Sequence, residues 1–328
     1  NEYTLGISLS GTPNGSETLT VNPVSSSIYD LAGNVASTSQ SNNSISLNDK
    51  LGPTMIISSS TVNSGETSND STISLTFTSS ESTTNFIESD ITISGGSLSS
   101  FSGSGTTYTA TLTQSGDATY TISVAQNKFT DSAGNNNSAS NTFSWTYDST
   151  APTITGVTLA SDNSTITVTF SETVWNYDLS PNSTGSLEVT DFVFELSGGT
   201  ASLSSTTPSS ISINGTEYTL GISLSGTPNG SEILTVNPAL DSIYDIVGNV
   251  ASTSQSNNSI SLNDKLSPTM TISSSTVNSG ETSNDSTISL TFTSSESTTN
   301  FVKDDITISS GSLSNLSGSG TTYTATLT

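Results

Sequence analysis

Apolar residues alternate with serine and threonine in one run after another along the chain. The clearest runs are Tyr3 to Leu9, Ile73 to Phe77, Tyr108 to Leu112, Tyr120 to Val124 and Ile166 to Phe170. A period of two is typical of strands with one buried face, and threonine suits the exposed face of a sheet. No segment of about ten residues or more shows helical periodicity. The pattern predicts an all-β protein.

The sequence repeats itself at a distance of 215 residues. Residues 1–113 recur at 216–328 with 15 differences. A shorter motif, Asp-x-(Ala/Val)-Gly-Asn, begins at Asp30, Asp131 and Asp245. Each copy is followed by an aspartate that opens a Pro-Thr linker, and these linker aspartates are Asp49, Asp148 and Asp264. Two domain types, A and B, therefore alternate.

The repeat predicts four segments. We expect residues 1–49 to be the C-terminal part of a type B domain, 50–148 a complete type A domain, 149–264 a complete type B domain, and 265–328 the N-terminal part of a type A domain. Both ends of the sequence are expected to fall inside a domain. About 100 residues with short strands is the size of an immunoglobulin-like β-sandwich with its own core. We expect such domains to follow one another as beads in an extended rod, and we interpret Trp175 to Leu187 as an enlarged loop of type B.

Several motifs occur in a fixed order within type A. They are Leu-Thr-Phe-Thr-Ser-Ser-Glu81, Asp90-Ile-Thr-Ile-Ser-Gly-Gly, Gly103-Ser-Gly-Thr-Thr-Tyr-Thr-Ala-Thr-Leu, Asp131-Ser-Ala-Gly-Asn and Asp148-Ser-Thr-Ala-Pro-Thr. As an ordered set they resemble the bacterial immunoglobulin-like repeats of very long secreted surface proteins. The resemblance covers all of A and the start and end motifs of B. It implies a stalk, adhesin or fibre, and in several relatives calcium stiffens the linkers.

Composition excludes much chemistry. The chain has 28 acidic residues, four lysines, and no arginine, histidine or cysteine, which gives a net charge of −24. Thiol nucleophiles, Ser-His-Asp triads, zinc sites and disulfides all need residues that are missing. The acidic field repels nucleic acid, and no apolar stretch approaches the ~20 residues that a membrane span requires. We expect no nucleic-acid partner and no membrane insertion in this segment.

Catalysis by paired carboxylates is the one enzymatic chemistry that the composition leaves open. Trp145 and Trp175 are the only tryptophans that could form a sugar platform, and neither has a repeated acidic cluster beside it in sequence. The Gly-Ser-Gly runs at 103–105 and 318–320 precede no lysine or helix, so we interpret them as hairpin turns and not as phosphate cradles. We expect a protein that is not an enzyme.

Nine carboxylates are candidate ligands for a hard cation at the domain ends. The candidate calcium ligands are Asp49, Asp148, Asp264, Asp30, Asp131, Asp245, Glu81, Glu172 and Glu296. Calcium takes six to eight oxygen ligands, but the ordered acidic positions of an EF-hand loop are not present. The alternative is purely structural, because Asp and Asn cap turns and Gly supplies a positive φ in the Asp-x-(Ala/Val)-Gly-Asn motif.

Three functions fit these observations. The first is the structural, non-catalytic repeat region of a long extracellular bacterial stalk or adhesin at the cell surface. The second is a subunit of a self-assembling filament, in which strand edges with few protective lysines pair between copies. The third is a ligand-binding adhesin module that uses the loop at Trp175 of type B. The expected partners are neighbouring repeats of the same protein and, in a fibre, other copies.

Overall fold

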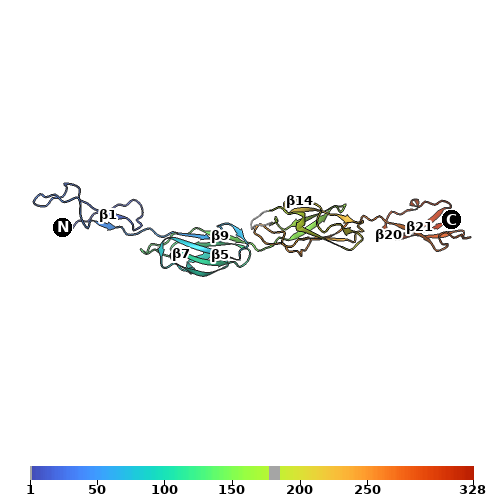
Figure 1. The fold of residues 1–328 in the computed structure, drawn as a ribbon, viewed down its shortest axis with the longest axis horizontal. Helices are drawn as coiled ribbons and strands as arrows, with labels where there is room; N and C mark the ends of the chain where they lie inside the picture. Colours follow the sequence, from blue (N-terminus) through green and yellow to red (C-terminus); the bar gives the residue numbers. More distant parts are fainter. Residues whose placement is uncertain (1, 177–184) are drawn as a thin grey trace. The chain divides into compact units, whose positions relative to one another are not determined.

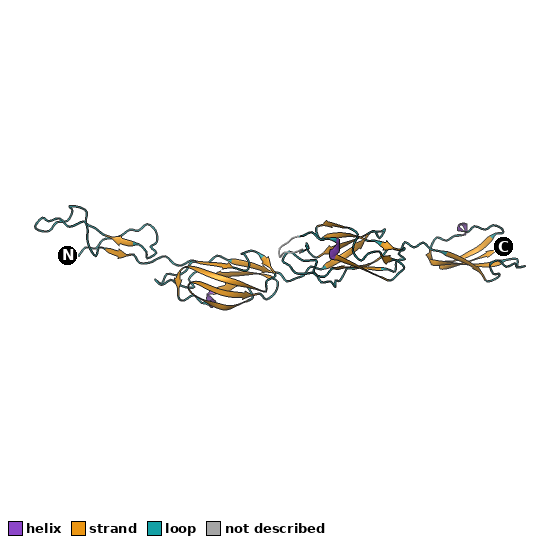
Figure 2. Cartoon of the chain, in the orientation of Figure 1, coloured by secondary structure: helices purple, strands orange, loops and turns teal. Residues whose placement is uncertain are grey.

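The protein is all-β, as the alternation of apolar residues predicts. A computed structural model describes residues 2–176 and 185–328 (Figure 1). Strands and loops account for nearly all of the described chain, and Figure 2 shows helix only as short turns. These are the 3-10 turns η1 (Glu88–Asp90), η2 (Val189–Asp191) and η3 (Lys303–Asp305). In the described chain, helices with the length and apolar character of a membrane span are absent.

The chain divides into two compact units. Unit 1 comprises Asn1–Thr153, Phe170–Leu187 and Pro238–Thr253, and unit 2 comprises Ile154–Thr169, Glu188–Asn237 and Ser254–Thr328. This division does not follow the sequence repeat. The boundaries of the domains at 50–148 and 149–264 therefore stay a prediction.

Two sheets in unit 1 form a sandwich, which we call sandwich A. The first sheet has the antiparallel order β3 (Met55–Ser59), β5 (Thr72–Thr83), β7 (Ser97–Thr113). The second has the order β4 (Thr67–Ser68), β9 (Phe143–Tyr147), β8 (Ala118–Val124), β6 (Ile91–Ile93), and only its β4–β9 pair is parallel. Alternate residues of each strand point inward, so the apolar residues that alternate in the sequence are the ones that are buried between the sheets.

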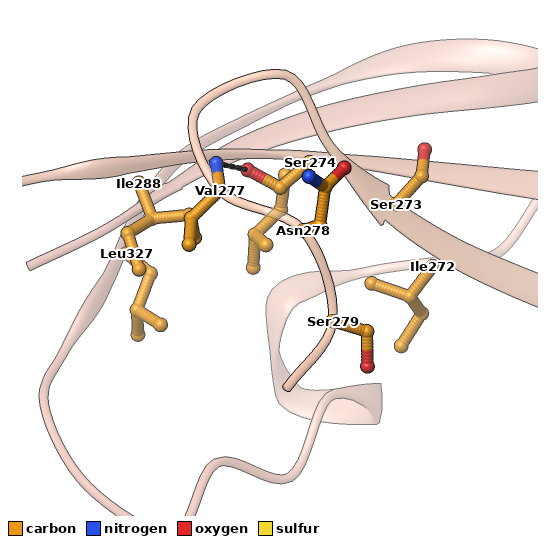
Figure 3. Close-up of a pocket in the computed structure, with 9 residues that line it drawn as sticks. Ile272, Ser273, Ser274, Val277, Asn278, Ser279, Ile288 and Leu327 are labelled. Carbon is orange, nitrogen blue, oxygen red and sulfur yellow. Dashed lines mark hydrogen bonds between the residues drawn. The ribbon is translucent and has the colours of Figure 1, made fainter. Parts of the chain in front are cut away.

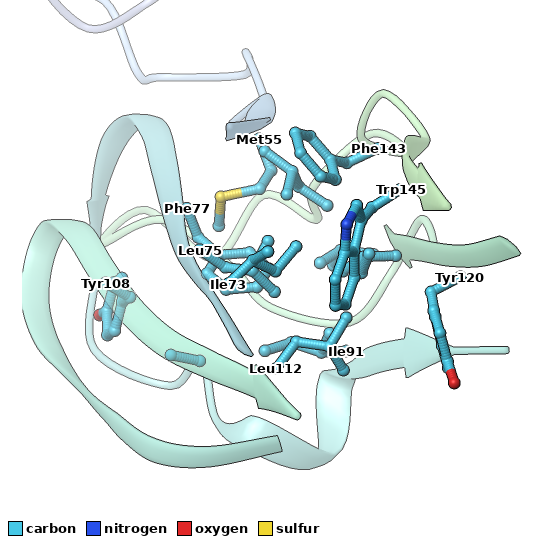
Figure 4. Packing of buried hydrophobic residues seen from close by; sticks show 14 of the residues in the cluster. Met55, Ile73, Leu75, Phe77, Ile91, Tyr108, Leu112, Tyr120, Phe143 and Trp145 are labelled. Atoms are coloured by element: carbon cyan, nitrogen blue, oxygen red, sulfur yellow. The ribbon is translucent and has the colours of Figure 1, made fainter. Parts of the chain in front are cut away.

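The core of sandwich A lies between these sheets. Figure 4 shows Leu75 and Phe77 from the first sheet facing Phe143 and Trp145 from the second. Phe86 lies at the centre of an aromatic group, with its ring centroid 5.1 to 5.8 Å from those of Phe77, Phe101, Tyr108 and Phe129. Edge-to-face aromatic pairs of this kind add to the stability that burial alone provides.

The Gly-Ser-Gly run of sandwich A lies where β7 turns back on itself. Gly103 has φ 138°, and a Cβ there would lie 2.5 Å from the Cα of Tyr108. The hydroxyls of Ser102 and Thr109 lie 3.3 Å apart across this reversal. A side chain at Gly103 would therefore clash with the returning strand.

The remaining strand pair of unit 1 is small. It joins β1 (Thr18–Thr20) to β2 (Ser44–Ser46) in antiparallel register. The prediction of a strand over residues 3–9 is wrong, because this run has no strand and Tyr3 is 83% exposed. Its counterpart Tyr218 is buried in β15 (Glu217–Gly221), which pairs with two neighbours. Residues 3–9 have no such neighbours in the described chain, and a strand is stable only in a sheet.

Unit 2 contains four sheets. One has the order β10 (Ile154–Leu159), β11 (Thr165–Phe170), β15, β14 (Ile211–Asn214), and another has β12 (Phe192–Ser197), β17 (Ile233–Pro238), β18 (Ser259–Ser261). The strands β13 (Ser202–Leu203) and β16 (Leu224–Ser225) form a short pair. The last sheet has the order β19 (Met270–Ser274), β20 (Ile288–Thr298), β21 (Leu313–Leu327) and repeats the first sheet of sandwich A.

Candidate metal centre

The three copies of the Asp-x-(Ala/Val)-Gly-Asn motif fold as the same turn. In each, the first aspartate accepts hydrogen bonds from the backbone N–H and the side-chain amide of the last asparagine. For Asp131 these two distances to Asn135 are both 2.9 Å. The glycine has a positive φ in every copy. The motif is therefore a side-chain-capped turn wherever it occurs.

The last asparagine of the motif also donates a hydrogen bond to a linker. The amide of Asn249 donates to the carbonyl of Asp148 at 3.1 Å, and the amide of Asn135 lies 3.5 Å from the carbonyl of Leu51. Gly52 packs so closely on the turn that a Cβ there would lie 2.0 Å from the carbonyl oxygen of Asn136. The turn thus fixes the chain segment that follows the linker aspartate.

This arrangement gathers three of the nine predicted carboxylates. Oxygens of Asp49, Glu81 and Asp131 all lie within 4.8 Å of one another, the only such acidic group among the described residues. Asp49 comes from the linker, Glu81 from β5, and Asp131 from the motif turn. Asp131 is buried and the other two are half-buried.

The negative charges of these three carboxylates repel one another. Burial raises the pKa of Glu81, and the negative charges of Asp49 and Asp131 raise it further. Burial also opposes ionisation of Asp131, but hydrogen bonds from Asn135, Ala133 and Gly134 outweigh it, so the pKa of Asp131 is lowered. Asp131 is therefore a fixed negative charge, and Glu81 is the member of the group that repulsion affects most.

The corresponding carboxylates at the next linker, Glu172, Asp148 and Asp245, influence one another electrostatically but form no group of that closeness among the described residues. Burial raises the pKa of Glu172, and the nearby charges of Asp245 and Asp148 raise it further. Asp245 is fully buried and accepts four hydrogen bonds within its turn, from Val247, Gly248 and the backbone and side chain of Asn249. The linker aspartate, the strand-end glutamate and the motif aspartate thus meet at Asp49, Glu81 and Asp131, and at the next linker the same three residue types interact through their charges.

Asp30, Asp264 and Glu296 also lie outside the acidic group in the described chain. Asp30 caps its own turn, and hydrogen bonds from Asn34 lower its pKa. Asp264 accepts a 2.9 Å hydrogen bond from the N–H of Leu266, as Asp49 does from Leu51. The sequence named these carboxylates as candidates, but it did not show that a motif aspartate meets the linker that precedes its own domain.

One anchoring residue was missed in the sequence analysis. Asp117 accepts hydrogen bonds from the backbone and hydroxyl of Ser149 at 2.9 and 2.7 Å, and one from the hydroxyl of Thr150. The hydroxyls of Thr150 and Ser149 and the N–H of Ser149 lower the pKa of Asp117. The run Ser115-Gly116-Asp117 fits an ordinary turn in the sequence, and its contact with the linker is visible only in the fold.

The enlarged loop predicted at Trp175 to Leu187 lies mostly outside the described residues, which omit 177–184. The flanking residues are described. Trp175 and Tyr244 form an antiparallel bridge, with their backbone N–H groups donating to each other's carbonyls at 2.8 and 2.9 Å, and Asn176 pairs with Gly185.

Comparison with known proteins identifies the family. The family model described as a bacterial Ig-like domain matches residues 49–147 and 264–328, which together are half of the chain. The chain therefore belongs to the bacterial Ig-like domain family, and the resemblance seen in the sequence is confirmed. Together with the two-sheet architecture, this match makes the protein a tandem of immunoglobulin-like domains.

No curated protein matches the chain. Several solved structures match the chain, and invasin and titin are two of them. The crystal structure of invasin, a bacterial integrin-binding protein, has 14% identity and a TM-score of 0.27, with 84% of this chain and 54% of that chain covered. The I9–I11 tandem of titin has 10% identity and a TM-score of 0.22, with 80% and 84% covered. The chain thus spans about half the length of the invasin structure.

Proposed function

We propose that the chain is a non-catalytic structural repeat region of a long extracellular bacterial surface stalk or adhesin. The observation that carries this proposal is the second family match, which begins at residue 264, 215 residues after the first begins at residue 49. Tandem duplication of a domain with its own core lengthens a protein without requiring new contacts. An acidic chain without cysteine, and with only four lysines as basic residues, suits exposure outside the cell.

A stalk should be extended in solution, and small-angle scattering of the full chain tests this. A compact protein of this length has a radius of gyration of about 20 Å. Domains with strands of 7 to 10 residues that follow one another in a line should instead give roughly 35 Å or more. A value near 20 Å would contradict the stalk. A value that rises steeply with protein concentration would favour the filament.

We also propose that the group of Asp49, Glu81 and Asp131 binds calcium, and that the corresponding residues Asp148, Glu172 and Asp245 bind a second calcium ion. The fit rests on chemistry: each group offers three carboxylates, and oxygen is the ligand that calcium prefers. Asp131 and Asp245 are held by their turns as fixed ligands. A bound cation would relieve the repulsion that raises the pKa of Glu81 and of Glu172. Because each group includes a linker aspartate, calcium would stiffen the linker.

Calcium titration of the full chain by calorimetry is expected to show two sites, and Asp131→Asn is expected to remove one. The neutral asparagine keeps an oxygen for the turn but loses the charge. Calcium at ten times its Kd should stabilise each liganded domain by about 1.4 kcal/mol. Asp30→Asn is the matched control, since Asp30 caps an equivalent turn without joining an acidic group in the described chain. Identical melting curves in calcium and in chelator would leave these aspartates as turn caps only.

A further inference from the structure

The linker that follows sandwich A is held from the sandwich side by one carboxylate. Asp117 directly precedes β8, which pairs with β9, the last strand of sandwich A. Its Oδ1 accepts hydrogen bonds from the N–H and the hydroxyl of Ser149 at 2.9 and 2.7 Å, and its Oδ2 accepts one from the hydroxyl of Thr150. Both oxygens of Asp117 therefore bind the linker.

The turn at Asp245 holds the same linker from the other side. The side-chain amide of Asn249 donates one hydrogen to the carbonyl of Asp148 at 3.1 Å and the other to Oδ2 of Asp245 at 2.7 Å. The N–H of Asp148 donates to the carbonyl of Ser68 in β4 at 3.1 Å. The two backbone groups of Asp148 thus bind sandwich A and the turn, and all of these residues belong to unit 1.

Sandwich A also contacts this turn directly. Asn69 follows β4, and its side-chain amide lies 3.4 Å from Oδ1 of Asn249. A Cβ at Gly248 would lie 3.6 Å from the same amide nitrogen. The contact therefore reaches the turn both through the linker and beside it.

The rest of the linker has few free rotations. The ring of Pro152 fixes its own φ, and Ala151 is restricted to extended conformations because it precedes a proline. The N–H of Thr153 donates to the hydroxyl of Ser171 at 3.1 Å, and the carbonyl of Thr153 accepts from the N–H of Ser171 at 2.8 Å. Every residue from 148 to 153 is thus constrained by a hydrogen bond or by the proline.

The residues that bind Asp117 distinguish this linker from the other two. After the linker aspartate it has Ser149 and Thr150, whereas the other linkers have Lys-Leu at 50–51 and 265–266. In both of those linkers the N–H of the lysine donates instead to the backbone carbonyl of a proline at 2.8 Å. The pair of hydroxyl donors therefore occurs only where type A precedes type B.

We propose that Asp117, residues 148–150 and Asn249 form a linker lock, which fixes sandwich A to the type B segment that follows it without a bound cation. Asp117 holds the linker from the sandwich and Asn249 holds it from the turn, so a bend at the linker must break hydrogen bonds on one side. Asp117 belongs to neither set of three carboxylates proposed to bind calcium. The lock makes one A–B pair, the length of the 215-residue repeat, a single stiff element.

Distances between two spin labels test the lock in the full chain, which has no cysteine of its own. Thr92→Cys on β6 and Ser212→Cys on β14 place the labels at exposed positions on either side of the linker. In the presence of a chelator, the chain with its natural linker should give one narrow distance distribution. Asp117→Ala should widen it about twofold, because residues 149 and 150 then regain the rotations of a flexible linker. Ser149→Ala combined with Thr150→Val should have the same effect, since it removes both hydroxyl donors.

Asp162→Ala is the matched control. Asp162 accepts hydrogen bonds from the N–H and the hydroxyl of Ser164 at 3.0 and 2.7 Å, nearly the same contacts that Asp117 makes with Ser149, but within one turn. Both aspartates are exposed, so both variants should fold, and only Asp117→Ala should widen the distribution. A wide distribution for the natural linker, an unchanged width in Asp117→Ala, or equal widening in both variants would overturn the proposal.

Discussion

Replacing Leu75 with alanine should destabilise sandwich A by about 2 to 5 kcal/mol, whereas Leu290→Ala should destabilise its own sheet by less than about 1.5 kcal/mol. The two leucines occupy the same register position, opposite Ala110 and Ala325 respectively. Leu75 is 1% exposed inside a closed core, so its removal leaves a cavity. Leu290 is half-buried and lines a pocket with Ile272 and Leu327 (Figure 3), so water fills the space that its side chain leaves.

Native-state hydrogen exchange measures the stability of each sheet separately within one chain, from the amides of β5 and of β20. Ile56→Thr provides the control, because the repeat already has threonine at the equivalent position, Thr271, and both side chains are exposed. We expect that change to alter the free energy of opening by less than about 0.5 kcal/mol. Equal losses in Leu75→Ala and Leu290→Ala would contradict the difference in burial between the two leucines.

The sequence pattern predicted the strands whose side chains alternate most regularly. Ile73, Leu75 and Phe77 become alternate buried residues of β5, and Tyr120, Ile122 and Val124 do the same in β8. Period-two burial is a local property of a strand, so it can be detected without knowing the partner. The resemblance to bacterial Ig-like repeats then supplied the architecture, and the family match confirms it.

Pairing between distant segments was harder to predict. Strand β4 contains two residues and exists only beside β9, so it has no alternation of its own. The run from Tyr3 to Leu9 has the alternation but no strand to pair with, and it was predicted incorrectly. The candidate site was hard to predict for the same reason, because Asp49 and Asp131 come together only when the chain returns to the linker end of sandwich A.

A buried glutamate that the sequence analysis did not single out organises part of unit 2. Glu232 is 0% exposed, and its carboxylate accepts hydrogen bonds from the N–H groups of Thr200 at 2.7 Å, Ala201 at 2.9 Å and Asn229 at 3.0 Å. Burial alone would raise its pKa, but the backbone N–H donors outweigh burial and lower the pKa from 4.5 to about 2. The ionised form therefore ties the segment before β13 to the start of β17.

Acid should remove this contribution. Because the pKa of Glu232 is lower in the folded state than in the unfolded chain, its stabilisation is complete above pH 4.5 and is lost as the pH falls towards 2. The shift corresponds to a loss of about 3 kcal/mol at most. Glu232→Gln should lose a similar amount already at pH 7, since a neutral amide is a weaker acceptor for three N–H groups and brings two donors of its own.

Hydrogen exchange of β17 at pH 7 and pH 3 separates this effect from general acid destabilisation. The wild-type chain should lose protection in β17 between the two pH values more steeply than Glu232→Gln, because the variant lacks the titrating group. Glu217→Gln, an exposed change on β15, should keep the wild-type slope. Parallel pH profiles for wild type and Glu232→Gln would show that the buried carboxylate does not control acid stability. A group that stabilises the fold through its charge must make the free energy of unfolding depend on pH as the group titrates.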